Sequence, residues 1–127
     1  MHENEISGII VSTAYDIHSK LGPGLFESVY ETIMEQELIH KHHLQVVRQF
    51  PIPVFWEGRK MELGFRADLL VENNILVELR SLEVISPVHY KQVLTYLRLS
   101  KRTLGLLINF NEELIKTGMK RIINGNI

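Results

Sequence analysis

Two acidic residues, Asp68 and Glu78, are the side chains in this sequence best placed to do chemistry together. They lie in two neighbouring stretches, residues 65–71 and 75–80, in which the odd-numbered positions are apolar. Alternation with a period of two residues is typical of half-buried β-strands. The Glu-Asn-Asn sequence between the two stretches favours a three-residue turn, because asparagine tolerates left-handed backbone conformations. The sequence therefore predicts a β-hairpin that buries its odd-numbered residues.

The length of the turn determines which residues of this hairpin face each other. A three-residue turn sets Val71 opposite Ile75, and the same register sets Asp68 opposite Glu78. Directly opposed side chains have Cβ atoms about 5 Å apart, so two carboxylates in these positions repel each other. A positive group is needed between them. The candidates are a divalent metal ion and two nearby arginine side chains, Arg66 and Arg80.

The composition predicts one folded domain over residues 1–127, with 45% hydrophobic residues. No apolar run approaches the roughly 18 residues of a membrane span, and the acidic N-terminal segment leads into no signal-like apolar core. We therefore expect no membrane partner and a cytoplasmic location. The absence of cysteine excludes disulfides, thiolate metal sites and cysteine nucleophiles. With a net charge of −1, contact with nucleic acid requires a local basic patch or a metal ion that bridges to phosphate.

The rest of the sequence predicts helices and strands around this hairpin. Apolar residues recur at helical spacing on both sides of Gly22-Pro23-Gly24, a turn that separates two helices. Pro51 and Pro53 place the first strand at an edge or a bulge, whereas the continuous apolar run at 104–108 is typical of a strand covered on both faces. The predicted order is helix 5–21, helix 25–41, strand 44–56, a turn at 57–60, the hairpin, helix 86–99, strand 104–108, and a short helical turn with a final strand within 112–126. Three consecutive antiparallel strands would form a meander in an α/β or α+β sheet with helices packed on it.

Two of the predicted helices also carry polar residues of interest. Glu27 lies in the first turn of the second helix, where an acid complements the helix dipole. In the third helix, Ser86 is a good N-cap, and Gln92 and Tyr96 share one face with His89. From spacing alone, this mixed face is expected to pack at the margin of the sheet.

Five short motifs follow one another along the chain. They are Gly-x-x-Glu-x-x-Tyr at 24–30, Arg-Ala-Asp-Leu-Leu-Val at 66–71, Val-Glu-Leu-Arg at 77–80, Pro-Val-His with Gln92 at 87–92, and Gly-Leu-Leu-Ile-Asn-Phe at 105–110. In this order they resemble the motifs of the bacterial and archaeal GxxExxY family, which is placed in the PD-(D/E)XK nuclease superfamily. The resemblance implies an α/β, restriction-endonuclease-like core. Its mixed central sheet contains a three-strand antiparallel meander plus further strands and is flanked by helices.

The resemblance also implies a metal site for Mg²⁺ or Mn²⁺. Asp68 resembles the metal-binding aspartate of the superfamily, and Glu78 resembles the acid of its (D/E)-x-K motif. The backbone carbonyl of Leu79 is implied as a further ligand, and Glu27 as the helix-borne acid that completes the site. Such a set of oxygen ligands suits Mg²⁺, which would activate a water molecule and stabilise the charge that develops on phosphate during phosphodiester hydrolysis.

The remaining implied roles concern nucleic acid, with DNA favoured over RNA as the partner. Gln92 and Tyr96 resemble the Gln-x-x-x-Tyr helix motif of RecB-like nucleases, which lies beside the site and the bound strand; Gln92 thereby joins the catalytic set. Arg80 stands where the motif has lysine. Arginine supplies positive charge but, with a pKa above about 12, is no general base. Two functions therefore stay open: a metal-dependent nuclease, and a catalytically impaired relative that binds nucleic acid or protein.

Overall fold

A five-stranded mixed sheet forms the centre of the protein, whose computed structural model describes residues 1–125. The strands lie in the order β1-β4-β5-β6-β7, with β5 and β6 parallel and the other neighbours antiparallel. Their bounds are Val46–Ile52 (β1), Phe65–Val71 (β4), Ile75–Arg80 (β5), Leu104–Asn109 (β6) and Met119–Ile123 (β7). Residue 126, the end of the predicted C-terminal segment, lies outside the described residues.

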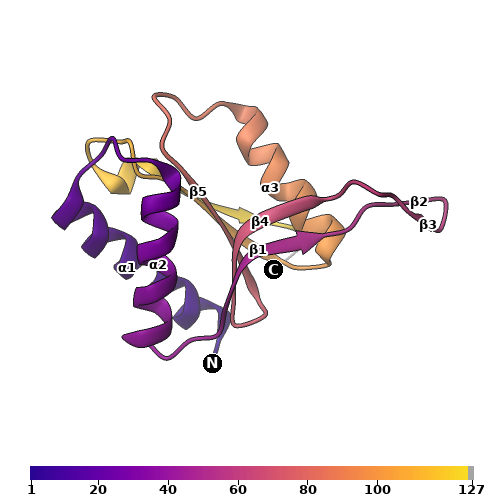
Figure 1. Ribbon diagram of the computed structural model, residues 1–127, viewed down its shortest axis with the longest axis horizontal. Helices are drawn as coiled ribbons and strands as arrows, with labels where there is room; N and C mark the ends of the chain where they lie inside the picture. Colours follow the sequence, from indigo (N-terminus) through magenta and orange to yellow (C-terminus); the bar gives the residue numbers. More distant parts are fainter. Residues whose placement is uncertain (126–127) are drawn as a thin grey trace.

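Helices cover both faces of this sheet (Figure 1). Helices α1 (Glu3–Leu21) and α2 (Glu27–His40) pack on one face, and α3 (Pro87–Ser100) packs on the other; a short 3₁₀ helix, η1 (Ile115–Gly118), precedes β7. Two apolar clusters, one on each side of the sheet, form the core. This arrangement confirms the predicted α/β fold with a mixed central sheet flanked by helices. Within residues 1–125, none of the helices is both long and apolar enough to cross a membrane.

The helix boundaries follow the local signals in the sequence. Helix α1 ends at Gly22, whose φ of 72° lies in the left-handed region that favours glycine. Helix α3 begins after its N-cap residue Ser86, with Pro87 in the first turn. The backbone N–H of Ser86 donates to Nδ1 of His89 at 3.0 Å, so this histidine is a partner in a capping interaction. The predicted boundaries of these two helices are correct to within two residues.

The hairpin of β4 and β5 is buried on both faces, which corrects the expectation that it is half-buried. Leu69 and Val77 pack against the α1–α2 side, whereas Leu70 and Leu76 lie in the cluster beneath α3. The reason is the connection from β5 to its parallel neighbour β6. A parallel connection must cross over the sheet, and here it places a helix on the face expected to meet solvent.

The predicted strand 44–56 is correct for residues 46–52 and wrong beyond them. Strand β1 ends at Ile52, and a separate two-stranded sheet follows, formed by β2 (Phe55–Trp56) and β3 (Arg59–Lys60). These short strands project from the body of the protein as an arm, defined here as residues 54–63 (Figure 1). Its turn consists of two residues, Glu57 and Gly58, which both have positive φ, as a type I′ hairpin requires. Pro53 separates the arm from β1, because proline cannot donate to the sheet ladder.

Candidate active site

The β4–β5 hairpin has a closed end at the turn and an open end near the acidic residues. At the closed end Val71 lies opposite Ile75, which confirms the predicted register, and the ladder continues to Leu69 opposite Val77. Glu72 and Asn73 in the turn both adopt positive φ near 53°. The regular pairing stops at Leu69 and Val77, one position before the two acids that the register sets opposite each other. From that point the two strands are joined in another way.

Side-chain carboxylates take over the hydrogen bonds of the ladder at the open end. The backbone N–H of Asp68 donates to Glu78 Oε1 at 2.9 Å, and the backbone N–H of Leu79 donates to Asp68 Oδ2 at 2.8 Å. Each acid thereby accepts a main-chain amide from the opposite strand. Such bonds hold two carboxylates at the junction although their charges repel each other.

The positive group between the acids is Arg80. Its guanidinium lies 2.9 Å from Glu78 Oε2 and 3.3 Å from Asp68 Oδ2. It also donates to the carbonyl oxygen of Leu79 at 2.9 Å and to Oε1 of Gln92 at 3.4 Å. One cation therefore contacts oxygen atoms of four residues that the resemblance places at the site. Arg66, the other candidate, is exposed.

Burial makes this acid pair sensitive to pH in the neutral range. Only 2% of Glu78 is exposed, and burial together with the charge of Asp68 raises its pKa to about 7. Burial likewise raises the pKa of Asp68 to about 6, although the amide of Leu79 and the charge of Arg80 act in the opposite direction. The negative charge of Glu31 adds to the increase for Asp68. Both carboxyl groups therefore change between the protonated and the ionised form near neutral pH.

Glu31 and Gln49 belong to the site, and the sequence interpretation missed both. Glu31 is 7% exposed; the side-chain amide of Gln49 donates to its Oε1 at 2.8 Å and to Asp68 Oδ1 at 3.4 Å. Arg48 completes this group through a 2.6 Å ion pair with Glu31. The spacing of four residues between Glu27 and Glu31, on one helix face, was an available signal.

Glu27 reaches the open end of the hairpin from the first turn of α2. Its Oε2 accepts the backbone N–H of Ser81 at 3.1 Å, directly after Arg80 in the chain. Burial lowers the pKa of Arg80, but the charges of Glu78 and Asp68 and, less strongly, of Glu27 raise it above its ordinary value. The predicted helix-borne acid is thus near the other site residues, and its role as a metal ligand stays a prediction.

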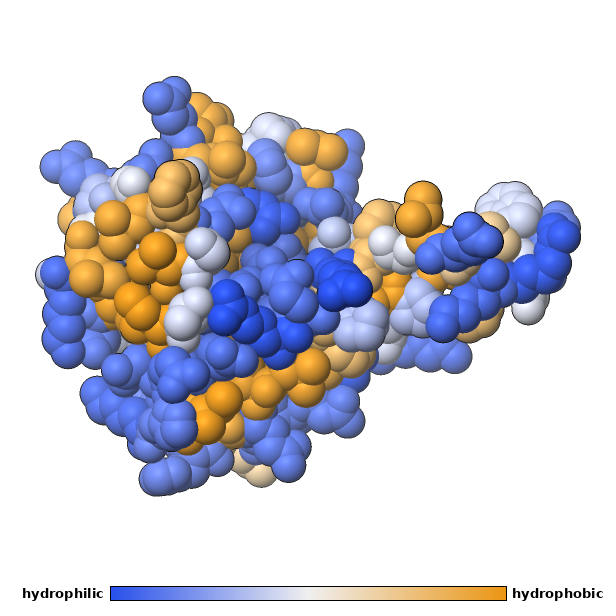
Figure 2. All heavy atoms as spheres, viewed as in Figure 1, coloured by the Kyte–Doolittle hydropathy of each residue, from blue (hydrophilic) through white to orange (hydrophobic). Residues whose placement is uncertain are grey.

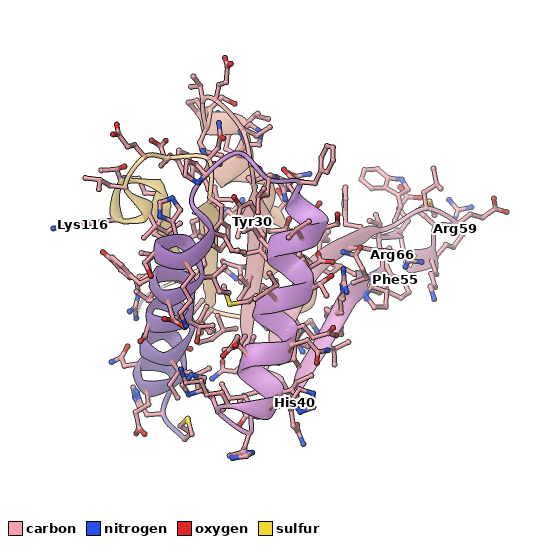
Figure 3. The ribbon with its side chains drawn as sticks, turned by 60° about the vertical axis from the view of Figure 1, so that its left-hand side comes forward. Tyr30, His40, Phe55, Arg59, Arg66 and Lys116 are labelled. Carbon is pink, nitrogen blue, oxygen red and sulfur yellow. The ribbon has the colours of Figure 1, made fainter. Side chains whose placement is uncertain are left out.

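Tyr30 fixes the loop that leads to Glu27. Its hydroxyl donates to the carbonyl of Gly22 at 2.7 Å and accepts the N–H of Leu25 at 3.2 Å. The buried ring, labelled in Figure 3, stacks on Phe110 with a centroid distance of 4.2 Å. The tyrosine of the Gly-x-x-Glu-x-x-Tyr motif is therefore a positioning residue for the start of α2.

Helix α3 brings Gln92 and Tyr96 to the opposite side of the same site. Gln92 contacts Arg80, as described above, and Tyr96 is 5% exposed. Burial raises the pKa of Tyr96, and the nearby charge of Glu78 contributes. The tyrosine ring lies 5.2 Å from the ring of Phe65, the first residue of β4. The shared helix face inferred from spacing therefore borders the acid pair.

The family of the chain follows from a comparison with family models. The model described as the PD-(D/E)XK nuclease superfamily matches residues 4–122. The chain belongs to the PD-(D/E)XK nuclease superfamily. This membership suggests a nuclease-type function with a nucleic-acid substrate, and nucleases of this superfamily generally use divalent metal ions. The narrower GxxExxY assignment stays a prediction.

One solved structure has a fold similar to that of this PD-(D/E)XK protein. The structure titled "Crystal structure of SSO0001" superposes with a TM-score of 0.57 at 20% sequence identity. The alignment covers 98% of this chain and 61% of the other, so the chain spans less than two thirds of that structure. At this level of identity the likeness concerns the fold alone. No protein with a curated description matches the chain significantly.

The donor atoms of this PD-(D/E)XK protein fit a hard cation chemically. Asp68 and Leu79 present oxygen atoms to Nη1 of Arg80, and Glu78 and Gln92 present oxygen atoms to Nη2. Oxygen is the ligand atom that Mg²⁺ prefers, and in this conformation the guanidinium of Arg80 fills the space between these oxygens. Within residues 1–125, no group of three or more His, Cys, Asp or Glu side chains is arranged to hold a metal ion. A divalent ion would therefore have to displace Arg80 from the carboxylates.

Proposed function

We propose that the protein is a nuclease that hydrolyses phosphodiester bonds with a divalent metal ion, Mg²⁺ or Mn²⁺, held by Asp68 and Glu78. The observation that carries the proposal is the convergence of oxygen atoms on the position of the Arg80 guanidinium. The buried Glu78 and the partly buried Asp68, with pKa values of about 7 and about 6, are poorly compensated by one arginine. A doubly charged ion would compensate them better, because it brings twice the charge to the same oxygens.

Each residue of the site has a definite task in this proposal. Asp68, Glu78 and the carbonyl of Leu79 bind the metal ion, and Glu27 completes its coordination. When bound, the ion supplies Lewis acidity and lowers the pKa of a coordinated water molecule. Arg80, once released from the acids, offers its planar guanidinium to a phosphate group. Gln92 and Tyr96, on α3, orient the nucleic-acid strand.

Asp68→Asn tests the proposal directly. Cleavage of labelled single-stranded and duplex DNA and RNA is measured with Mg²⁺, with Mn²⁺ and with a chelator. We expect cleavage that needs the metal, and a loss of about 100-fold or more in Asp68→Asn, since removing a key electrostatic group at a reacting centre costs this much. Calorimetry should show Mn²⁺ binding to the wild type only. Asp16→Asn, which changes the other aspartate of the chain, should cleave normally. Failure of the wild type both to bind Mn²⁺ and to cleave any of these substrates would exclude the proposal.

A second candidate function is favoured by the same arginine. Because Arg80 already occupies the space between the two acids, the protein is also suited to bind nucleic acid or a protein without cleaving it. Arg80→Lys distinguishes the two candidates, since lysine is the residue of the superfamily motif. Equal or faster cleavage than an active wild type supports the nuclease. Cleavage by the variant alone identifies the natural protein as a disabled nuclease.

A further inference from the structure

The arm carries large apolar side chains that the rest of the protein does not cover. Phe55 is 58% exposed, Trp56 is 64% exposed and Leu63 is 85% exposed. A two-stranded ribbon is at best marginally stable by itself, so it gains little from aromatic rings that bury nothing. Figure 2 shows apolar and polar side chains side by side along the projecting arm, in contrast to isolated exposed apolar residues, which are common on protein surfaces.

The register of the arm places one aromatic ring beside one cation on each of its faces. Phe55 lies opposite Lys60, and Trp56 lies opposite Arg59. Opposed residues of an antiparallel pair share a face, and successive residues alternate between faces. One face therefore presents Phe55 with Lys60, and the other presents Trp56 with Arg59. Aromatic rings interleaved with basic side chains are the usual means of binding single-stranded nucleic acid, because bases stack on the rings and phosphates meet the cations.

The arm is also directly connected to the candidate active site. Strand β4 begins at Phe65, just after the arm, and reaches Asp68 three residues later. Phe65 itself is partly exposed, and its ring contacts the buried ring of Tyr96 beside the acid pair. Figure 3 shows Phe55 and Arg66 near the base of the arm and Arg59 farther out.

The cations of the arm are balanced by acids in number but not in position. Residues 54–63 contain two basic residues, Arg59 and Lys60, and two acidic residues, Glu57 and Glu62, and Arg66 follows the arm. One of the acids, Glu57, lies 3.9 Å from Arg59 in a fully solvated pair, which contributes little and leaves the guanidinium available. The arm therefore has no net charge, but Lys60 and Arg59 each lie opposite an aromatic residue, where they are available to a phosphate group.

We propose that the arm binds unpaired nucleotides of the strand that lies at the candidate active site. Bases stack on Trp56 and Phe55, and Arg59 and Lys60 contact the adjacent phosphates. The inference rests on the proposed nuclease function for its class of ligand, and it adds a preference: single strands, flaps and frayed ends bind more tightly than closed duplexes, whose bases are not free to stack.

Trp56 reports on this contact by itself, because it is the only tryptophan in the chain. The intrinsic fluorescence of the wild type is titrated with a single-stranded DNA of about 16 nucleotides, within the range of single-strand site sizes, and with the matching duplex. A chelator is present throughout, so that no cleavage occurs. We expect quenching by the single strand that saturates with binding, and much weaker quenching by the duplex at equal concentration. Binding without any change in the fluorescence of Trp56 would overturn the inference.

Variants separate stacking from general charge attraction. Trp56→Ala should weaken binding of a dye-labelled single strand, followed by anisotropy, by about tenfold, the scale of losing one stacked base. Trp56→Phe should restore most of the affinity, because it keeps an aromatic face. Leu114→Ala is the matched control, since Leu114 is 67% exposed but lies beside η1, away from the arm. Equal affinity of Trp56→Ala and the wild type would exclude a role for the arm.

The remaining outcomes distinguish this inference from the proposed function. Single-strand binding through Trp56 without metal-dependent cleavage supports the arm and rejects the nuclease. Metal-dependent cleavage without any change in the fluorescence of Trp56 supports the nuclease and rejects the role of the arm. If Trp56→Ala instead changes a wild-type dimer into a monomer in sedimentation and binds the strand normally, the arm is a contact between two copies of the chain and the inference is wrong.

Discussion

The two ends of the β4–β5 hairpin use the same strands for opposite purposes. At the closed end, backbone pairs with backbone, and apolar side chains are buried on both faces, such as Val77 on one face and Leu76 on the other. At the open end, carboxylates replace the backbone hydrogen-bond partners, and the two acids form ion pairs with Arg80. The first arrangement stabilises the fold, whereas the second keeps charges in a place that is costly for stability. Substitutions at the two ends should therefore have opposite signatures.

The largest expected effect is at the closed end. Leu76→Ala removes a side chain with 0% exposure and leaves a cavity between β5 and α3. The free energy of unfolding, measured by urea denaturation, should fall by about 2–5 kcal/mol, as for other buried leucines. Leu114→Ala, at an exposed position, should change it by less than about 0.5 kcal/mol. A loss for Leu76→Ala as small as that of the control would show that this end does not stabilise the fold.

At the open end, the free energy of unfolding should depend on pH, because the two acids titrate there. The native pKa values of Asp68 and Glu78 are raised from 3.8 and 4.5 to about 6 and about 7, so the native state binds protons that the unfolded state releases. The stability that these protons contribute is fully present below about pH 4 and is lost as the pH rises to about 7. For a change of about two pKa units at one acid, the loss is on the order of 3 kcal/mol.

Neutralising the acid pair tests that origin. In the double variant Asp68→Asn, Glu78→Gln, the decrease in unfolding free energy between pH 4 and pH 8 should largely disappear. The same variant should not cleave nucleic acid, because both proposed metal-binding acids are gone. Asp16→Asn should keep the decrease of the wild type. A double variant with the same pH dependence as the wild type would place the titrating groups elsewhere.

The smallest effect concerns the backbone beside the open end. Gln49 has a φ of 54°, a conformation that costs a residue with a side chain roughly 1–2 kcal/mol and glycine much less. Gln49→Gly and Gln49→Ala both remove the amide between Glu31 and Asp68, so the difference between them isolates the backbone. Thermal unfolding should show the glycine variant to be more stable by about 1 kcal/mol. Equal stability would mean that the local backbone is not strained.

The parts of the fold that depend on local signals could be predicted from the sequence. The turn length determined the register of Val71 with Ile75, and helical spacing identified the face of Gln92 and Tyr96. The coverage of both faces of the hairpin is a long-range consequence of the crossover through α3. The only local signal of this coverage was the presence of two apolar residues, Leu70 and Leu76, on the face expected to be polar. The arm was missed because Pro51 and Pro53 fit equally well with a bulged strand and with the end of one.

Most residues of the candidate site could be predicted from the sequence, whereas the contacts between their side chains could not. Asp68, Glu78, Arg80 and Gln92 are brought together as the motifs implied. The choice among Arg66, Arg80 and a metal ion depends on side-chain geometry across the sheet, which spacing does not determine. Gln49 was missed for the same reason, since its contact with Glu31 joins two elements through a backbone conformation that has no sequence signature.

The position of β7 at the margin of the sheet has a consequence for the synthesis of the chain. All six residues of β6 are buried, and one side of this apolar strand pairs with β7, the last strand in chain order. Until β7 has emerged from the ribosome, β6 is an open, aggregation-prone edge. Once in place, β7 closes that edge and presents Lys120 and Arg121 to solvent, where their charges disfavour addition of another strand. The edge of β6 therefore stays open to other chains until β7, the last strand of the described residues, has been synthesised and has paired with it.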